Sequence, residues 1–426
     1  MATGPLSGVR ILEFSQIVSL PFGGVVLSDM GAEVIKVEAI TGDPHRNLGA
    51  VVPGESKRFQ SLNRGKSSIA VDLRSEQGRA TIHRLVQGVD VVTCNYRYGV
   101  AERLGIDYET LREHNPALIY CEVTGFGNVG PMRDRGGTDI VASAYSGLMA
   151  GDRKVDEQGL PANITAISLA DYVCGFSVAV GVSSALYHRA QTGEGQKIES
   201  SLLASALAVQ DTQIMRDPVH DAVQRDPMMA VVDAARARNV PYTELLDVYR
   251  GRRGQARSAF FAFWRSYYTQ DGVVVLGALT PPGRTAARRV LGIAEDGSDL
   301  PDFDASDPVN VERAEALISR IEELMLARTT AEWVQAFGEA GVPVSPLNLP
   351  EDMADDPQVA AMGMMTEIEH TTGTQRVAGP IVNMSVTPPA VQGPSPALGQ
   401  HTDEVLRAAG FEEGEIAALR DQGVIG

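Results

Sequence analysis

Short apolar segments alternate with helical patterns along the first part of this chain, and this alternation constrains the fold more than any other feature. The strand-like segments are residues 8–15, 33–39, 67–73, 90–96 and 117–126, and the clearest helical patterns between them are residues 21–32 and 75–89. Short apolar strands that alternate with helices predict a parallel sheet with helices on both faces. Ligands of such sheets bind at the carboxyl ends of the strands.

The pattern changes along the rest of the chain, and 426 residues are many for one core. Residues 170–210 predict one or two long helices, residues 217–257 are polar and charged, and strand-like runs resume around a turn at Asp271 and Gly272. We therefore expect an α/β protein. Its expected parts are a doubly wound, parallel-sheet large domain in residues 1–216, a linker and a smaller α/β domain in residues 217–325, and a return linker with a C-terminal part that completes the large domain in residues 326–426.

The charge balance excludes one class of partner. There are 54 acidic and 37 basic residues, for a net charge of −17. Such a surface repels phosphate backbones, so we expect no nucleic acid partner, and an anionic ligand needs local basic residues. There is no uninterrupted apolar run long enough for a bilayer, and the first residues lack the features of a signal peptide. We expect no membrane partner and a cytoplasmic location.

Cysteine and histidine usage gives no sign of a disulfide framework or a metal. Cys94, Cys121 and Cys174 are far apart in the sequence and lie among apolar or small residues, so we expect buried thiols. The seven histidines are scattered without the spacing of metal ligands. The sequence predicts no metal site.

Gly125, Gly127 and Gly130 have the G-x-G-x-x-G spacing of a dinucleotide-binding loop. A strand precedes them, but Pro131 and a charged, glycine-rich stretch follow where an apolar helix is required. The first strand has no glycine pair after it. We therefore interpret the motif as a turn, and an NAD-linked oxidoreductase stays an unfavoured alternative from another functional class.

Asp171 is the sharpest candidate for chemistry. It follows the strand-like run of residues 164–170 and stands at the start of an apolar helix. A carboxylate at that position accepts hydrogen bonds from free helix N–H groups and lies at the positive end of the helix dipole. One interpretation is a helix N-cap worth about 1 kcal/mol, which is the commoner role. The other is a nucleophile that attacks an activated acyl group.

Matching segments along nearly the whole chain connect it with a known family. They are "PLSGVRILEFS", "LSDMGAEVIKVE", "SLNRGKSSIAVDLRSEQGR", "DVVTCNYRYGVAERLGIDYETLREHNPALIYCEVTGFGNVGPMRDRGGTDI", "SLADYVCG", "HRAQTGEGQKIESSLL", "TTAEWVQAFGEAGVPVSPL", "DPQVAAMGM" and "PALGQHTDEVL". On these segments the chain resembles the class III CoA-transferases of the CaiB/BaiF type, which include formyl-CoA transferase, carnitine CoA-transferase and α-methylacyl-CoA racemase.

The resemblance implies an interlocked homodimer and a CoA-transferase in which Asp171 is the catalytic aspartate. Asp171 would form a mixed anhydride and then an aspartyl-CoA thioester, and CoA would pass to a free carboxylic acid. A coenzyme A thioester is then a substrate, and no cofactor is permanently bound. The implied binding residues are Gln16 and Val18 near the thioester, and Lys66, Val71, Leu73, Arg74, Asn95, Tyr96, Arg97 and Arg103 around CoA.

The chain also departs from the family pattern. Ala39 stands where the family often has arginine, Val18 stands where formyl-CoA transferase has glutamine, and residues 278–284 occupy the place of that enzyme's glycine-run loop. These departures disfavour formate and oxalate. Thr138 replaces the histidine that the racemases carry before Asp139, and threonine cannot take a proton at neutral pH.

An acyl-CoA racemase or epimerase is therefore the second choice within the family. Because Thr138 cannot serve in proton exchange, we expect Asp139 to be structural and to bond nearby backbone. A non-catalytic CoA-binding protein is a further alternative from another class, and it would keep the basic residues without needing Asp171.

Overall fold

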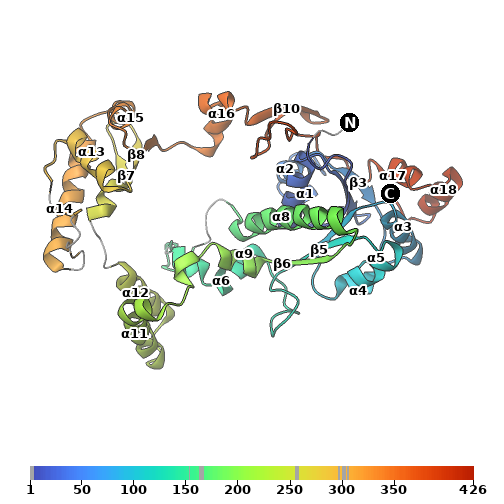
Figure 1. Cartoon of the computed structure of the whole chain (residues 1–426), viewed down its shortest axis with the longest axis horizontal. Helices are drawn as coiled ribbons and strands as arrows, with labels where there is room; N and C mark the ends of the chain where they lie inside the picture. The colour runs from blue at the N-terminus through green and yellow to red at the C-terminus, as the bar shows by residue number, and fades with distance from the viewer. Residues whose placement is uncertain are drawn as a thin grey trace. The chain divides into compact units, whose positions relative to one another are not determined.

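The chain folds as two compact units, and this computed structural model describes residues 4–152, 154–162, 167–254, 259–295, 298–299, 304 and 307–426. The first unit combines Met1–Arg216 with Pro357–Gly426, and the second is Asp217–Asp356. Figure 1 traces the elements of both units.

A six-stranded sheet forms the frame of the first unit, with the strand order β3-β2-β1-β4-β5-β6. Its strands are β1 (Arg10–Phe14), β2 (Glu33–Glu38), β3 (Ser67–Ala70), β4 (Val91–Cys94), β5 (Ile119–Thr124) and β6 (Lys197–Ser201). Every neighbouring pair is parallel. The order reverses between β1 and β4, which is where doubly wound sheets bind ligands. The parallel sheet predicted from the sequence is confirmed.

Helices cover both faces of this sheet. The helices of the first unit are α1 (Ser19–Asp29), α2 (Lys57–Asn63), α3 (Glu76–Val86), α4 (Val100–Leu104), α5 (Tyr108–His114), α6 (Asp139–Tyr145), α7 (Leu148–Asp152), α8 (Leu169–Thr192), α9 (Leu202–Ala208), α16 (Pro357–Ala361), α17 (Thr402–Ala408) and α18 (Glu413–Asp421), with 3-10 turns η1 (Pro44–Arg46) and η2 (Asp211–Gln213).

Alternation along the strands builds one apolar core on each face. In β1, Leu12 and Phe14 pack with side chains of α3, α5 and the C-terminal helices. Ile11 faces the other way and packs with side chains of α1, α8 and α9. Both faces are buried, so the strands carry nearly continuous apolar runs, as expected for a parallel sheet. Cys94, Cys121 and Cys174 are buried free thiols within these cores.

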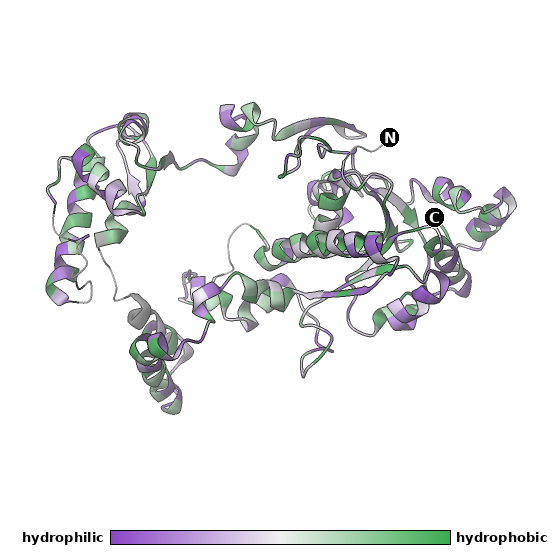
Figure 2. Cartoon of the chain, in the orientation of Figure 1, coloured by the Kyte–Doolittle hydropathy of each residue, from purple (hydrophilic) through white to green (hydrophobic). Residues whose placement is uncertain are grey.

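Helix α8 is the longest helix of the first unit, and Figure 2 shows that it is largely hydrophobic. By length and composition alone it is able to cross a membrane, which the sequence analysis did not expect of any segment. Its buried residues, among them Cys174, Val178 and Val182, pack in the core against α1 and the sheet. We therefore interpret α8 as a core helix.

One prediction about this region was wrong. Residues 170–210 were expected to be helical throughout, but Lys197–Ser201 forms β6, the edge strand beside β5. β6 is an edge strand, and its residues alternate between exposed and partly buried. Its sequence is therefore polar and lacks the apolar run that marks the central strands.

The C-terminal segment returns to the first unit. A two-stranded antiparallel ribbon, β10 (Met365–His370) and β11 (Gly373–Ala378), comes first. Val405, Leu406 and Ile416 of α17 and α18 then pack in the core beside the sheet. Ile425 forms an antiparallel bridge with Val71, directly after β3. The end of the chain therefore supports one of the loops that the parallel sheet predicts for ligand binding.

The second unit has its own antiparallel sheet of order β7-β8-β9 and its own core. Its elements are α10 (Pro218–His220), the π-helical turn η3 (Asp221–Arg225), α11 (Asp226–Ala237), α12 (Tyr242–Gly254), η4 (Ala259–Phe263), β7 (Trp264–Tyr268), β8 (Val273–Gly277), α13 (Pro281–Leu291), α14 (Pro308–Met325), α15 (Thr330–Glu339), β9 (Val344–Pro346) and η5 (Pro350–Asp355). The turn expected at Asp271 and Gly272 joins β7 to β8 as a hairpin.

Two expectations about this unit need correction. The small domain was expected to end near Met325, but the unit extends to Asp356, because Trp333 and Phe337 of α15 fill its core and β9 pairs with β8. Residues 217–254 were expected to be a polar linker, but they form helices. These helices are amphipathic and bury only a few side chains, among them Val232 and Leu246, so their surface is polar.

Candidate active site

A cavity of about 660 Å³ opens at the carboxyl ends of the parallel strands. Its wall contains Gln16 and Ile17 after β1, Ala39 to Thr41 after β2, Val71 to Arg74 after β3, Asn95 to Tyr98 after β4, and Gly125 after β5. Asp171 and Ser19 line it from the first turns of α8 and α1, and Thr138, Asp139, Arg133 and Arg135 line it from the loop after β5 and the start of α6. The site therefore lies where the topology of the sheet predicts a ligand.

The structure brings together most of the residues that the sequence analysis selected. Those that line the cavity are Gln16, Val71, Leu73, Arg74, Asn95, Tyr96, Arg97 and Asp171. Val18, Lys66 and Arg103 are not part of its wall. Val18 is a buried residue at the N-cap of α1, and Arg103 lies exposed on α4.

Lys66 is held by internal charges and is not available to a phosphate. Its Nζ lies 2.8 Å from Glu13 Oε1 and donates to the Pro21 carbonyl at 2.8 Å and to Asn63 Oδ1 at 3.2 Å. Only 4 % of the residue is exposed. Burial lowers its pKa to about 8. The family resemblance suggested Lys66 as a CoA-binding residue, but the sequence could not show that its side chain turns into the core.

Asp171 lies in the first turn of α8, three residues after the N-cap residue Ser168. The predicted N-cap role is therefore wrong, since Ser168 has that position. Part of the strand-like run that was expected before Asp171 lies outside the described residues. The Asp171 carboxylate faces the cavity, and only 7 % of the residue is exposed.

Asp139 supports the helix turn that carries Asp171. Asp139 Oδ1 accepts a hydrogen bond from the Asp171 backbone N–H at 3.2 Å. Asp139 thus bonds backbone as the sequence analysis proposed, although its partner is distant in the chain. Both carboxyl groups line the same cavity, so two like charges meet there.

The environment raises the pKa of Asp171 to about 7. Burial is the largest cause, and the neighbouring Asp139 charge adds to it. A hydrogen bond with Ser19 and the positive charge of Arg58 act in the opposite direction. A carboxylate with a pKa near neutrality inside a cavity is a signature of a functional group.

Close packing of α1 and α8 places Ser19 beside Asp171. A Cβ at Gly175, one turn after Asp171, would lie 2.7 Å from the Ser19 carbonyl oxygen. Only glycine permits this approach of the two helices. Sequence reasoning missed Ser19 and Arg58. A hydroxyl in the first turn after β1 was the available signal for Ser19, but many such residues are only helix caps.

The loop after β1 is fixed by a pair of hydrogen bonds. Asn95 Oδ1 accepts from the Gln16 N–H at 2.9 Å, and Asn95 Nδ2 donates to the Gln16 carbonyl at 2.8 Å. The next residue, Ile17, has a φ of +73°, which is a left-handed conformation for a β-branched side chain. Local strain of this kind is concentrated at functional sites.

The arginines of the wall give the cavity a positive side in an acidic protein. The Arg74 side chain is 86 % exposed and forms an ion pair with Asp72 at 3.0 Å. The Arg133 guanidinium lies 5.0 Å from the ring centre of Tyr98. Arg97 and Arg135 line the same wall. Exposed arginines at strand ends suit the capture of phosphate groups.

The loop with the G-x-G-x-x-G spacing has a structural explanation. A Cβ at Gly125 would lie 2.6 Å from the Cα of Gly137, so two backbone segments touch there. Gly127 and Gly130 have φ values of +89° and +87°, which favour glycine. This loop continues through Gly137 to Thr138 and Asp139. Its glycines therefore shape the wall of the cavity by backbone contact and turns.

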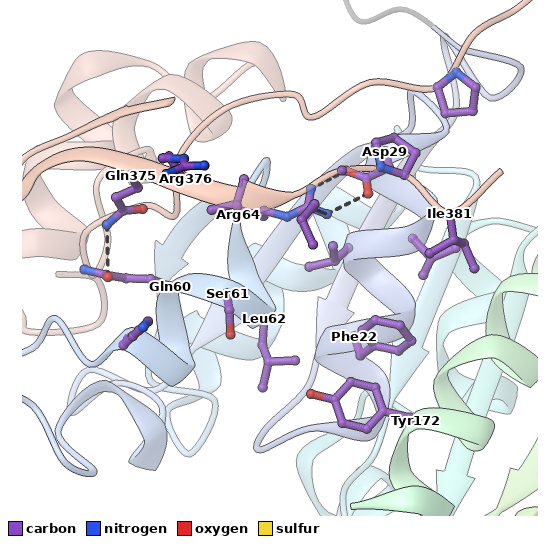
Figure 3. A pocket seen from close by; sticks show the side chains of 18 of the residues that line it. Phe22, Asp29, Gln60, Ser61, Leu62, Arg64, Tyr172, Gln375, Arg376 and Ile381 are labelled. Carbon is purple, nitrogen blue, oxygen red and sulfur yellow. Dashed lines mark hydrogen bonds and ion pairs between the residues drawn. The ribbon is translucent and has the colours of Figure 1, made fainter. Parts of the chain in front are cut away.

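A second cavity, of about 730 Å³, is lined by α1, α2, the first turn of α8 and strand β11 (Figure 3). Phe22 and Tyr172 form one side of it and stack edge to face at 4.7 Å between ring centres. Arg64 reaches Asp29 within it, with 2.8 Å between Nη2 and Oδ2. Its wall contains neither Asp171 nor the strand-end arginines.

Among the described residues, no group of three or more His, Cys, Asp or Glu is arranged to hold a metal ion.

Comparisons with known proteins agree with this geometry. The model of CoA-transferase family III matches residues 6–402. The succinyl-CoA:glutarate CoA-transferase of Mus musculus is 31% identical over 425 residues, which cover 99% of this chain and 90% of that protein. The succinate–glutarate CoA-transferase of Agrobacterium fabrum is 32% identical over 412 residues, covering 94% and 95%.

A solved structure supports the same comparison. The crystal structure of a CAIB/BAIF family protein from Brucella suis has a TM-score of 0.74 and 28% identity to this chain. The match covers 96% of this chain and 100% of that one. The likeness therefore extends over both compact units.

Proposed function

The chain belongs to CoA-transferase family III and is a CoA-transferase, and we propose that Asp171 is the nucleophile that passes CoA from an acyl-CoA donor to a free carboxylic acid. The observation that supports this most is the position of Asp171. It is a buried carboxylate with a pKa of about 7, in a cavity at the carboxyl ends of a parallel sheet. At neutral pH a large share of it is ionised, and the ionised form is the nucleophile.

The reaction balances without an oxidant or ATP. The Asp171 carboxylate attacks the donor thioester, the C–S bond breaks, and a mixed anhydride and CoA thiolate form. The thiolate attacks the aspartyl carbonyl, a C–O bond breaks, and the donor acid leaves as its carboxylate. The acceptor carboxylate then repeats these two steps in reverse. Each step exchanges one activated acyl group for another, and covalent capture divides one difficult exchange into easier ones.

The exposed arginines of the wall suit the phosphates of CoA. Arg74 and Arg97 follow β3 and β4 and line the cavity with Asp171. Charge-assisted, bidentate hydrogen bonds from guanidinium groups are well matched to phosphate. We propose that these two residues contact CoA. Their substitution by glutamine should then raise KM for the acyl-CoA donor while KM for the acid changes little.

A CoA-exchange screen tests the function. Purified protein receives acetyl-CoA or succinyl-CoA together with acetate, propionate, succinate, glutarate or oxalate, and mass spectrometry detects new acyl-CoA esters. Succinate and glutarate are included because they occur in the names of the two relatives. We expect new esters with the wild type and none with Asp171→Ala. An equally active Asp171→Ala protein would exclude Asp171 as the nucleophile.

An acyl-CoA racemase is the alternative within the family, and the same samples test it. Thr138 lines the cavity directly before Asp139, and a threonine hydroxyl cannot act as the base that takes a proton near neutral pH. We therefore expect no exchange of the α-proton of 2-methylacyl-CoA in deuterated water. Exchange that Asp171→Ala abolishes, without CoA transfer to any acid, would favour the racemase.

We also propose that the active protein is an interlocked homodimer, as the family resemblance implies. Large apolar side chains line the second cavity and remain exposed in the single chain, among them Val51, Ile381 and Val382. Exposed apolar groups gathered at one place favour contact with another chain. Light scattering at micromolar concentration should give twice the mass of one chain, and a monomer that transfers CoA would contradict this proposal.

A further inference from the structure

The Arg58 guanidinium lies at the start of the helix that carries the proposed nucleophile. The mechanism proposed above gives Arg58 no role. We propose that Arg58 binds the reacting carboxylate of the acid substrate and positions it against the carbonyl of the aspartyl-CoA thioester formed on Asp171. This inference rests on the proposed function of Asp171. Arg58 would bind the acid substrate, whereas the arginines at the strand ends would bind CoA.

The position of Arg58 is set by the first turn of α2. The hydroxyl of Ser56 caps this helix by accepting a hydrogen bond from the Phe59 N–H at 3.0 Å. The side chain of Phe59 is fully buried, and the Arg46 guanidinium lies over its ring, 3.8 Å from the centre. Phe59 thus anchors the turn in the core, while its neighbour Arg58 is exposed.

The guanidinium of Arg58 reaches the start of α8. Its Nη2 lies 3.5 Å from Ser168 Oγ. Ser168 is the N-cap residue of α8, and its hydroxyl makes no cap hydrogen bond. Asp171 follows it by three residues and belongs to the first turn of the helix that Ser168 opens. The guanidinium therefore lies at the turn that carries the nucleophile, outside the residues that line the 660 Å³ cavity, and its positive charge lowers the pKa of the Asp171 carboxyl group.

Arg58 is also free to bind an anion. In the described part of the chain it has no ion-pair partner within 4 Å, and the contact with Ser168 is long. Arg74, by contrast, has Asp72 as a partner at 3.0 Å. A guanidinium has five N–H donors in a planar fork that fits a carboxylate with two parallel hydrogen bonds. Arg58 therefore has unused donors of the required kind.

The reaction needs such a group at this place. An acid carboxylate must come close to Asp171 where Asp139 lines the same cavity, in a protein with a net charge of −17. Like charges at close range oppose that approach. A guanidinium beside the nucleophile neutralises the incoming carboxylate and holds one of its oxygens toward the aspartyl carbonyl. When that oxygen attacks the aspartyl-CoA thioester, the C–S bond breaks and CoA thiolate leaves, and no proton is transferred.

Steady-state kinetics of Arg58→Gln test the inference, with the fastest donor from the exchange screen and two acids, propionate and succinate. Loss of a charged hydrogen-bonding partner should raise KM for both acids about 10- to 100-fold. KM for the donor should change less than about threefold. Arg58→Lys keeps the positive charge but not the planar guanidinium, so its KM for both acids should lie between those of the wild type and Arg58→Gln. Lys57→Gln removes the same charge from the adjacent position of α2 and should resemble the wild type.

Other outcomes would overturn the assignment. If the wild type is active and Arg58→Gln has the same KM for both acids, the role of Arg58 is refuted. The proposed role of Asp171 is not affected by that result. A rise in KM for succinate but not for propionate shows that Arg58 binds the second carboxylate of succinate and not the reacting one. A shift of the acid limb of the pH–rate profile to higher pH without a change in KM shows that Arg58 only keeps Asp171 ionised. Absence of exchange by the wild type rejects the proposed function itself.

Discussion

Replacing Asp171 by asparagine should stabilise the protein at alkaline pH while abolishing CoA transfer. The pKa of Asp171 is about 7 in the folded protein, because burial and the Asp139 charge disfavour ionisation, against 3.8 for an ordinary aspartate. One pKa unit corresponds to 1.36 kcal/mol. Holding Asp171 ionised above pH 7 therefore costs the fold up to about 4 kcal/mol, and asparagine removes that cost.

The sign of the pH dependence follows from proton binding. Between about pH 4 and pH 7 the folded protein holds a proton on Asp171 that the unfolded chain has lost, so stability falls as the pH rises through this window. Below about pH 4 both states are protonated, and the wild type and Asp171→Asn should have similar stability. From pH 5 to pH 8 the advantage of the variant should grow by about 2 to 3 kcal/mol.

Thermal unfolding at pH 5 and pH 8, at one protein concentration, measures this difference. The Tm of Asp171→Asn should exceed that of the wild type by roughly 5 °C more at pH 8 than at pH 5, for a unit of this size. The variant should form no acyl-CoA product in the exchange screen. A Tm difference that is the same at both pH values would refute the argument that Asp171 is ionised at a cost to the fold.

Three further outcomes are expected. Asp139→Asn removes the neighbouring charge, so the acid limb of the pH–rate profile, which reports the ionisation of Asp171, should move to lower pH. Lys66→Met leaves Glu13 buried with weaker pairing and should destabilise the fold by about 3 to 5 kcal/mol. The fraction of Lys66→Met that folds should have the same KM for the acyl-CoA donor as the wild type. A rise in this KM alone would show that Lys66 does contact CoA. Gly125→Ala forces two backbone segments apart and should lower both Tm and kcat, and an unchanged kcat would show that this loop does not shape the cavity.

The parallel sheet could be predicted because its strands are buried on both faces and therefore appear as apolar runs. The edge strand Lys197–Ser201 could not, since half of it faces solvent and its sequence is polar. The end of the small domain was misplaced for a similar reason. The contacts that tie α15 and β9 to this unit are made with β7 and β8, which lie far away in the sequence.

The candidate site shows the same division. Residues such as Asn95 and Arg74 were expected at the site from the family resemblance, and the topology explains why they meet, since loops that follow parallel strands lie at one edge of the sheet. The direction of a side chain is a tertiary property. Lys66 turns into the core toward Glu13, and Arg58 turns toward the start of α8, and no local pattern distinguishes one from the other.

The left-handed conformation of Ile17 connects the buried polar groups with the site. Such a conformation costs roughly 1 to 3 kcal/mol for a residue other than glycine, so the surrounding structure must enforce it. Asn95 holds Gln16 by two hydrogen bonds from the neighbouring strand end. Lys36 adds a hydrogen bond from its Nζ to the Ser15 carbonyl at 2.8 Å. Because partners from two other strands hold Ser15 and Gln16, the two residues before Ile17, the loop after β1 is held firmly in place. In the mechanism that we propose, this loop forms part of the wall beside the thioester that Asp171 attacks.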